Sequence, residues 1–70
     1  MSQSVYKVVE LVGSSSESWE QAAVAAVKRA SETLQDLRIA EVAGMDLHIK
    51  DGKIESYRTR VKVSFKVKGS

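Results

Sequence analysis

The first apolar segment of the chain, residues 5–12, is dense in β-branched and aromatic side chains and therefore predicts a β-strand. Apolar residues outnumber charged ones on both of its faces, whereas a strand with one face in water alternates more cleanly. Both faces are therefore expected to contact other parts of the protein. Gly13 and the serines at 14–16 are expected to end the strand.

From residue 18 to about residue 35, apolar positions recur every three or four residues, which predicts an amphipathic helix. The stripe consists of Trp19, Ala22, Ala23, Ala26, Val27, Ala30 and Leu34. Because most of these residues are alanine, the helix axis can approach a sheet closely. Ser15 or Ser16 is expected to cap the helix. A helix start of this kind can also bind an anion, but capping is the favoured interpretation.

Two further strand-like segments, residues 37–49 and 54–67, flank the dipeptide Asp51-Gly52, which predicts a type I′ hairpin turn. If the helix returns along the sheet, the first and second strands run in the same direction. An antiparallel sheet then places the third strand between them.

The predicted fold class is therefore α+β. We expect a single βαββ domain over residues 1–70, in which a three-stranded antiparallel sheet of order 1-3-2 packs on one amphipathic helix. The tail at residues 68–70 is expected to be frayed.

A two-residue turn also fixes a register between the last two strands. It pairs Ile49 with Ile54 and, by extension, Ile39 with Ser64, Glu41 with Lys62, Ala43 with Arg60 and Met45 with Arg58. Directly opposed residues share a face. The helix is then expected to cover the face that carries Ala40, Val42, Val61, Val63 and Phe65.

The opposite face mixes apolar and charged residues instead of being wholly polar. Its predicted members are Leu37, Ile39, Glu41, Ala43 and Met45, beside Arg58, Arg60 and Lys62. A surface of this composition is expected to be covered by another subunit or by a ligand. We therefore predict a ligand-binding surface that includes Ile39, Glu41, Met45, Arg58 and Arg60.

Length and composition narrow the possible functions. A chain of 70 residues buries a small core, and such chains usually gain stability from disulfides, a metal or a partner subunit. The sequence has no Cys and one His, which excludes disulfides and argues against a His-built metal site within one chain. A homo-oligomer is therefore expected.

Other partners are not indicated. The formal net charge of +2 is too small to predict nucleic-acid binding, and the longest apolar run, residues 22–27, is too short to span a membrane. The amino terminus lacks the basic-then-apolar pattern of a signal peptide, so a cytoplasmic location is expected.

Catalysis has little support, and we predict no enzymatic activity. His48 and Asp46 share a strand face and are able to hold a metal or relay a proton, but ordinary hairpin surface is the favoured interpretation. Trp19 offers a platform for stacking a ring, although a place in the core or in a subunit contact is favoured.

A row of basic residues on the last strand faces either phosphates or carboxylates. The row consists of Arg58, Arg60, Lys62 and Lys66. Exposure to solvent, or pairing with carboxylates such as Glu41 and Glu10, is the favoured interpretation.

In order and spacing, several short motifs resemble the dodecin family over about residues 4 to 67. They are Gly13-Ser-Ser-Ser, Ser18-Trp-Glu-Gln-Ala-Ala, Ala40-Glu-Val, Asp51-Gly52, Tyr57-Arg58 and Val61-Lys-Val-Ser-Phe65. The resemblance implies βαββ chains that assemble into hollow shells of twelve subunits. It also implies a non-catalytic small-molecule partner, a flavin (FMN, riboflavin or FAD), bound in stacked pairs between subunits and stored or quenched there.

Two positions depart from the family pattern. Ile39 stands where typical dodecins carry the Trp that stacks on the flavin, and Arg58 stands where they carry a Gln that hydrogen-bonds it. Ile has no π face, and Arg cannot accept a hydrogen bond. The sequence therefore looks closer to a dodecin-like branch associated with calcium. The alternative to a flavin-binding shell is accordingly a flavin-free structural or calcium-associated assembly, whose calcium ligands the sequence does not assign.

Overall fold

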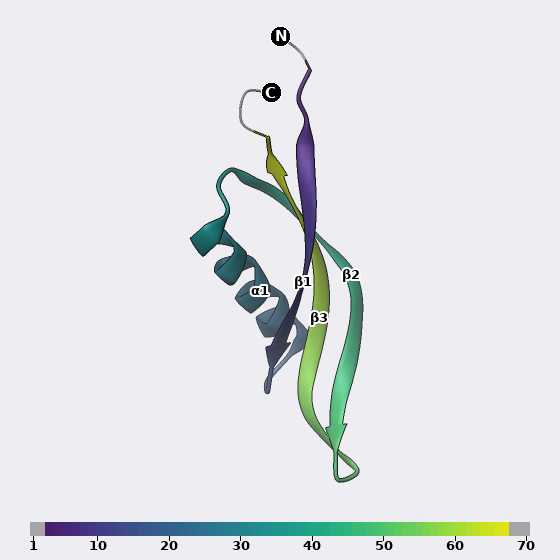
Figure 1. Cartoon of the computed structure of the whole chain (residues 1–70). Helices are drawn as coiled ribbons and strands as arrows, with labels where there is room; N and C mark the ends of the chain where they lie inside the picture. The colour runs from purple at the N-terminus through teal and green to yellow at the C-terminus, as the bar shows by residue number, and fades with distance from the viewer. Residues whose placement is uncertain (1–2, 68–70) are drawn as a thin grey trace.

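The fold is described by a computed structural model that places residues 3–67. The elements are β1 (Tyr6–Ser15), α1 (Trp19–Thr33), β2 (Leu37–Lys50) and β3 (Lys53–Lys66). The sheet has the order β1-β3-β2, and both pairs of neighbours are antiparallel. Figure 1 shows α1 on one side of this sheet, with the β2–β3 hairpin reaching beyond the helix. The predicted α+β fold is confirmed; the tail predicted to fray, residues 68–70, lies outside the described residues.

The start of α1 is organised by two serines. Ser18 is the N-cap, and its hydroxyl accepts a hydrogen bond from the Gln21 N–H at 3.0 Å. The Ser15 hydroxyl accepts one from the Glu17 N–H at 3.0 Å and so shapes the preceding turn. The prediction that Ser15 or Ser16 caps the helix was therefore wrong, because the chain makes one more turn before the helix begins.

The end of α1 comes slightly earlier than predicted. The helix stops at Thr33 rather than near residue 35, and the Leu34 N–H closes its last turn on the Ala30 carbonyl at 2.8 Å. Asp36 then adopts a left-handed backbone conformation, with φ of 59°, as the chain turns into β2.

Gly13 lies within β1 instead of ending it, so the predicted strand boundary was wrong. The strand continues to Ser15 because residues 13–15 keep their antiparallel pairing with β3. A Cβ at Gly13 would collide with the main-chain carbonyl of Ala22 and crowd the Ala26 side chain. The close approach that the alanine stripe predicts is therefore confirmed, and it requires glycine on the facing strand.

The β2–β3 turn agrees with its prediction. Asp51 and Gly52 both have positive φ, 53° and 75°, and the flanking residues Lys50 and Lys53 pair with each other. This is the backbone that a type I′ turn requires. The predicted pairing of Ile49 with Ile54 is confirmed as well.

The predicted register fails over residues 44–48. Irregularities between Val42 and Gly44 and between His48 and Ile49 shift this segment by one position, whereas the pairs formed by Ile39 and Glu41 are as predicted. Met45 consequently pairs with Thr59 rather than Arg58. A shift of one residue reverses every side chain of the segment, so Met45 lies on the helix side of the sheet.

The same effect changes two other assignments. Gly44, not Ala43, lies opposite Arg60. A third irregularity, after Leu37, places that residue opposite Phe65, and Leu37 packs against the core instead of joining the far face.

The core is small and lies between α1 and the β1–β3 half of the sheet. Its buried members are Ala22, Ala26, Ala30, Val61 and Val63, with the polar Thr59. Ala40 and Val42 face the same way as this core, but the helix does not reach them, and both are exposed. Within residues 3–67, no helix is long and apolar enough to cross a membrane.

The folded chain is elongated. Its radius of gyration is 14.5 Å, whereas a compact domain of this length has about 11 Å. Large apolar side chains stay exposed along its length: Val5, Tyr6, Val8, Val12, Trp19, Val24, Ile39, Val42, Met45, Leu47, Ile49 and Ile54. An elongated shape with this much exposed apolar surface is typical of a subunit rather than of a self-sufficient monomer.

Candidate ligand-binding site

The side of the sheet opposite α1, hereafter the outer face, brings together four of the five predicted site residues. The register places Ile39 and Glu41 of β2 on this face beside Arg58 and Arg60 of β3. Met45, the fifth, lies on the helix side. β1 completes the outer face with Tyr6, Val8, Glu10 and Val12.

The centre of the outer face is an ion pair between Arg58 and Asp46. Arg58 Nε lies 2.7 Å from Asp46 Oδ1, and Arg58 Nη2 lies 2.9 Å from Oδ2, so the guanidinium holds both carboxylate oxygens. The hydrogen bonds from Arg58 lower the pKa of the Asp46 carboxyl, and the carboxylate raises the pKa of Arg58.

Arg60 extends this arrangement across the sheet. Its Nε lies 3.7 Å from Glu10 Oε2 on β1, and its Nη1 lies 3.8 Å from Asp46 Oδ2 on β2. The guanidinium occupies the space above Gly44, where any Cβ would overlap it. The bulge next to Gly44 therefore lets one arginine reach carboxylates on both neighbouring strands.

The next cross-strand row continues the alternation of charge, because Lys62 lies in register between Glu10 and Glu41. The middle of the outer face thus sets three cations beside three carboxylates: Arg58, Arg60 and Lys62 beside Asp46, Glu10 and Glu41. The favoured interpretation of the basic row, pairing with carboxylates, is confirmed for Arg60 and Glu10.

Apolar side chains border this charged centre. Ile39 on β2 is 68% exposed, and Val8 and Val12 on β1 are also exposed. Ile39 lies opposite Ser64, whose hydroxyl is 3.4 Å from the Ile39 carbonyl. The outer face therefore offers apolar contact at its edges and a nearly neutral polar centre.

Asp46 is also held from the helix side. The Trp19 indole Nε1–H donates to the Asp46 main-chain carbonyl at 3.1 Å, and the Trp19 ring packs edge-on against Tyr57 with centroids 5.1 Å apart. The Thr59 hydroxyl in turn donates to the Trp19 carbonyl at 2.9 Å. Trp19 is thus engaged in packing, the interpretation favoured from the sequence, although 38% of it remains exposed.

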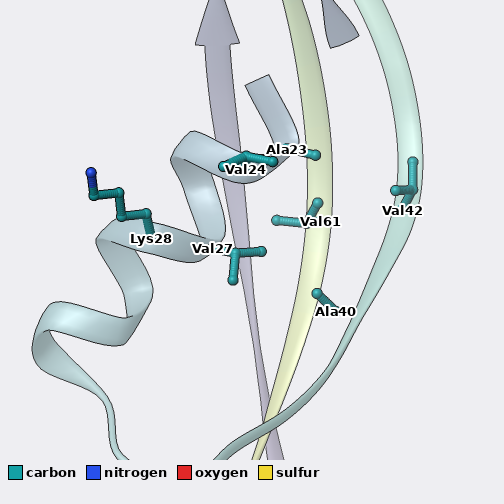
Figure 2. A pocket seen from close by; sticks show the side chains of 7 residues that line it. All are labelled: Ala23, Val24, Val27, Lys28, Ala40, Val42 and Val61. Carbon is teal, nitrogen blue, oxygen red and sulfur yellow. The ribbon is translucent and has the colours of Figure 1, made fainter. Parts of the chain in front are cut away.

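A groove separates α1 from β2 on the helix side (Figure 2). Its volume is about 450 Å³, and it is lined by Ala23, Val24, Val27, Lys28, Ala40, Val42 and Val61. All but Lys28 are apolar, and Val42 is 53% exposed. The groove exists because the helix lies over β1 and β3 and leaves β2 uncovered.

The predicted pair of Asp46 and His48 does share a face, but the two side chains have different partners. Asp46 binds Arg58, whereas His48 Nδ1 lies 3.0 Å from Glu55 Oε1 near the hairpin end. Among residues 3–67, no group of three or more His, Cys, Asp or Glu side chains could hold a metal ion. The favoured interpretation, hairpin surface, agrees with this arrangement.

Sequence reasoning missed Asp46 as the partner of Arg58, and it missed the groove. Asp46 could not be assigned because its position opposite Arg58 depends on the bulge at Gly44. One residue in the sequence points to the groove: Val24 adjoins the apolar stripe of the helix and widens it toward β2.

A comparison with protein-family models matches residues 5–68 to the dodecin family. The chain belongs to the dodecin family. The curated calcium dodecin of Mycobacterium tuberculosis is 43% identical over 65 residues, covering 93% of this chain and 92% of that protein. The dodecin of Thermus thermophilus is 40% identical over 63 residues, covering 90% and 91%.

Solved dodecin structures share the fold. The dodecin of Streptomyces coelicolor superposes with a TM-score of 0.91 at 37% identity and covers all of both chains. The crystal structure of the Mycobacterium tuberculosis calcium dodecin, described as having a novel calcium-binding site, gives a TM-score of 0.83 at 47% identity and covers 96% of each chain.

Proposed function

We propose that this protein is a non-catalytic subunit of a dodecin-type homo-oligomeric shell, with twelve chains, that binds or sequesters a small molecule on the outer face of the sheet. The observation that carries the proposal is the outer face itself. It combines exposed Ile39 with a fixed Arg58–Asp46 centre, on a sheet side that no element of the described chain covers. Membership of the dodecin family supports the assembly into a shell and indicates a flavin as the class of ligand.

Assembly is supported by the surface that one chain leaves uncovered. The groove between α1 and β2 is nearly all apolar, and the elongated chain has few buried residues. A second copy seated on the groove would remove Val24 and Val42 from water, which supplies stability that a single small core lacks. Met45 lies on this same side and is proposed to contribute to the subunit contact that borders the ligand.

Flavin is the ligand class that the family implies, and the residues present fit it in part. Ile39 provides apolar contact for a flavin ring but no π face to stack on it. Arg58 donates hydrogen bonds but is engaged by Asp46. We therefore propose a flavin bound through apolar contact and donated hydrogen bonds, beside Glu41 and Arg60.

Riboflavin fluorescence tests this proposal. A rise in the fluorescence anisotropy of riboflavin on addition of micromolar assembled protein is the expected result, because a flavin bound to a large assembly rotates more slowly than the free molecule. The Ile39→Ala variant removes most of the apolar contact and is expected to weaken binding by about tenfold. Unchanged fluorescence anisotropy of riboflavin with tens of micromolar assembled protein would contradict flavin binding while leaving the shell intact.

A second candidate is a calcium-associated assembly without flavin, and the similarity to the calcium dodecin favours it. Calcium takes six to eight oxygen ligands, and residues 3–67 of one chain hold no group of three or more His, Cys, Asp or Glu side chains that could hold a metal ion. The ligands would therefore come from two or more subunits. A rise in melting temperature with calcium but not with magnesium supports this candidate, and no shift with either ion contradicts it.

A further inference from the structure

We propose that Asp46 determines which ligands the outer face accepts: by occupying Arg58, it selects neutral ligands over those that carry phosphate. The inference rests on the proposed ligand site and names the class of ligand that the site takes. For flavins, it favours riboflavin over FMN.

The geometry of Arg58 leaves one edge of its guanidinium already occupied. A guanidinium binds phosphate best through two parallel N–H groups, the same arrangement that binds a carboxylate. In this chain, Nε and Nη2 of Arg58 already hold both oxygens of Asp46, at 2.7 and 2.9 Å. An incoming phosphate must therefore displace Asp46 from this edge of the guanidinium.

The charge around the Arg58–Asp46 pair also disfavours a phosphate. A second cation, Arg60, lies within 4 Å of both Glu10 and Asp46. A phosphate that reached either arginine would meet the negative charge of a carboxylate at the same place. Like charges in contact disfavour binding, whereas a neutral ligand that accepts hydrogen bonds avoids this repulsion.

Asp46 is fixed on both sides of the sheet. Its carboxylate is bound by Arg58 on the outer face, while its main-chain carbonyl accepts the Trp19 indole N–H. Trp19 itself packs against Tyr57 and accepts a hydrogen bond from Thr59. The position of the carboxylate is therefore set by the packing of the helix, and the selection against anions is built into the fold.

The test compares FMN with riboflavin on the wild-type protein and on Asp46→Asn, which keeps the shape of the side chain and removes its charge. The wild type is expected to bind riboflavin at least as tightly as FMN. In Asp46→Asn, the affinity for FMN is expected to rise about tenfold, the effect of one hydrogen bond to a charged group, with little change for riboflavin. The matched control is Glu32→Gln, which removes an equal charge from the helix surface, where Glu32 pairs with Arg29.

Inorganic pyrophosphate, measured by calorimetry, separates this inference from the flavin proposal. If Asp46→Asn binds pyrophosphate at least tenfold more tightly than the wild type does, the role of Asp46 is supported even when neither protein binds a flavin. An unchanged ratio of FMN to riboflavin affinity together with unchanged pyrophosphate binding overturns the inference. The inference is also overturned if the wild-type protein binds FMN tenfold more tightly than riboflavin. This measurement does not depend on the folding of a variant.

Discussion

Asp46 connects the two sides of the sheet through its carboxylate and its main-chain carbonyl. Arg58 binds the carboxylate on the outer face, and Trp19 binds the carbonyl from the helix side. The sequence offers no direct sign of this arrangement, because alternation alone places Asp46 beside His48 without saying which strand residue lies opposite. The pairing of Asp46 with Arg58 depends on the bulge next to Gly44, which the sequence pattern does not reveal.

The Asp46–Arg58 pair makes a prediction about stability and pH. Because Arg58 lowers the pKa of Asp46 below its ordinary value of 3.8, the pair stabilises the folded state above that value, and the contribution is lost as the pH falls through the lowered pKa. The wild type should therefore be slightly more stable than Asp46→Asn at neutral pH, since exposed ion pairs contribute little.

Urea unfolding at neutral pH and in acid measures this difference. The difference in the free energy of unfolding between the wild type and Asp46→Asn is expected to vanish in acid, because residue 46 is then uncharged in both proteins. A difference of constant size at every pH would show that Asn harms packing instead of removing an ion pair.

The N-cap of α1 gives a second prediction. Ser18→Ala removes the acceptor of the Gln21 N–H and should destabilise the protein by about 1 kcal/mol. Ser16→Ala, at one of the two serines that the sequence predicts as a cap, is the matched control and should be nearly neutral. Thermal unfolding of both variants decides between them; equal losses would contradict the assignment of Ser18.

At the scale of elements, the order and the type of every helix and strand could be predicted from the sequence. Apolar periodicity separates the helix from the strands, and Asp51-Gly52 fixes the hairpin turn. The register in the middle of the β2–β3 hairpin could not be predicted. One bulge shifts it by one residue and a second bulge shifts it back, so the segments on either side keep the predicted pairing. Between these two bulges residues 44–48 are displaced, which moves Met45 to the helix side, and a separate irregularity displaces Leu37.

The contact between α1 and β1 predicts unequal effects for two glycines. Gly13→Ala sets a Cβ against the rigid main-chain carbonyl of Ala22, so overpacking should cost about 1–3 kcal/mol or more. Gly44→Ala meets only the flexible end of Arg60, which can move aside. Denaturant unfolding should therefore show a large loss for Gly13→Ala and a small loss for Gly44→Ala; similar losses would contradict the close helix approach.

At the scale of the whole molecule, the sequence predicts a partner subunit and one of the two uncovered surfaces, the outer face, but not the groove. The sequence indicated an outer face too apolar for water, and the exposure of Ile39 agrees. The groove between α1 and β2 was not anticipated, because apolar periodicity predicts that a helix covers a sheet without showing how far it reaches. The helix covers two of the three strands.

The groove yields the final prediction, which concerns assembly. Val42 is 53% exposed in the single chain and lines the groove, so Val42→Asp places a charge where a second copy is proposed to sit. Burying that charge without a partner is strongly unfavourable, whereas in the isolated chain it stays in water. Light scattering should therefore show a folded variant of low mass, against a large wild-type assembly.

Gln21→Asp is the matched control, because it introduces the same side chain at an exposed position of α1 outside the lining of the groove. This variant should keep the wild-type mass. If Val42→Asp also keeps it, the groove is not a subunit contact. A wild-type mass near 7.7 kDa at micromolar concentration would contradict the shell itself, and the outer face would then have to bind its ligand on a single chain.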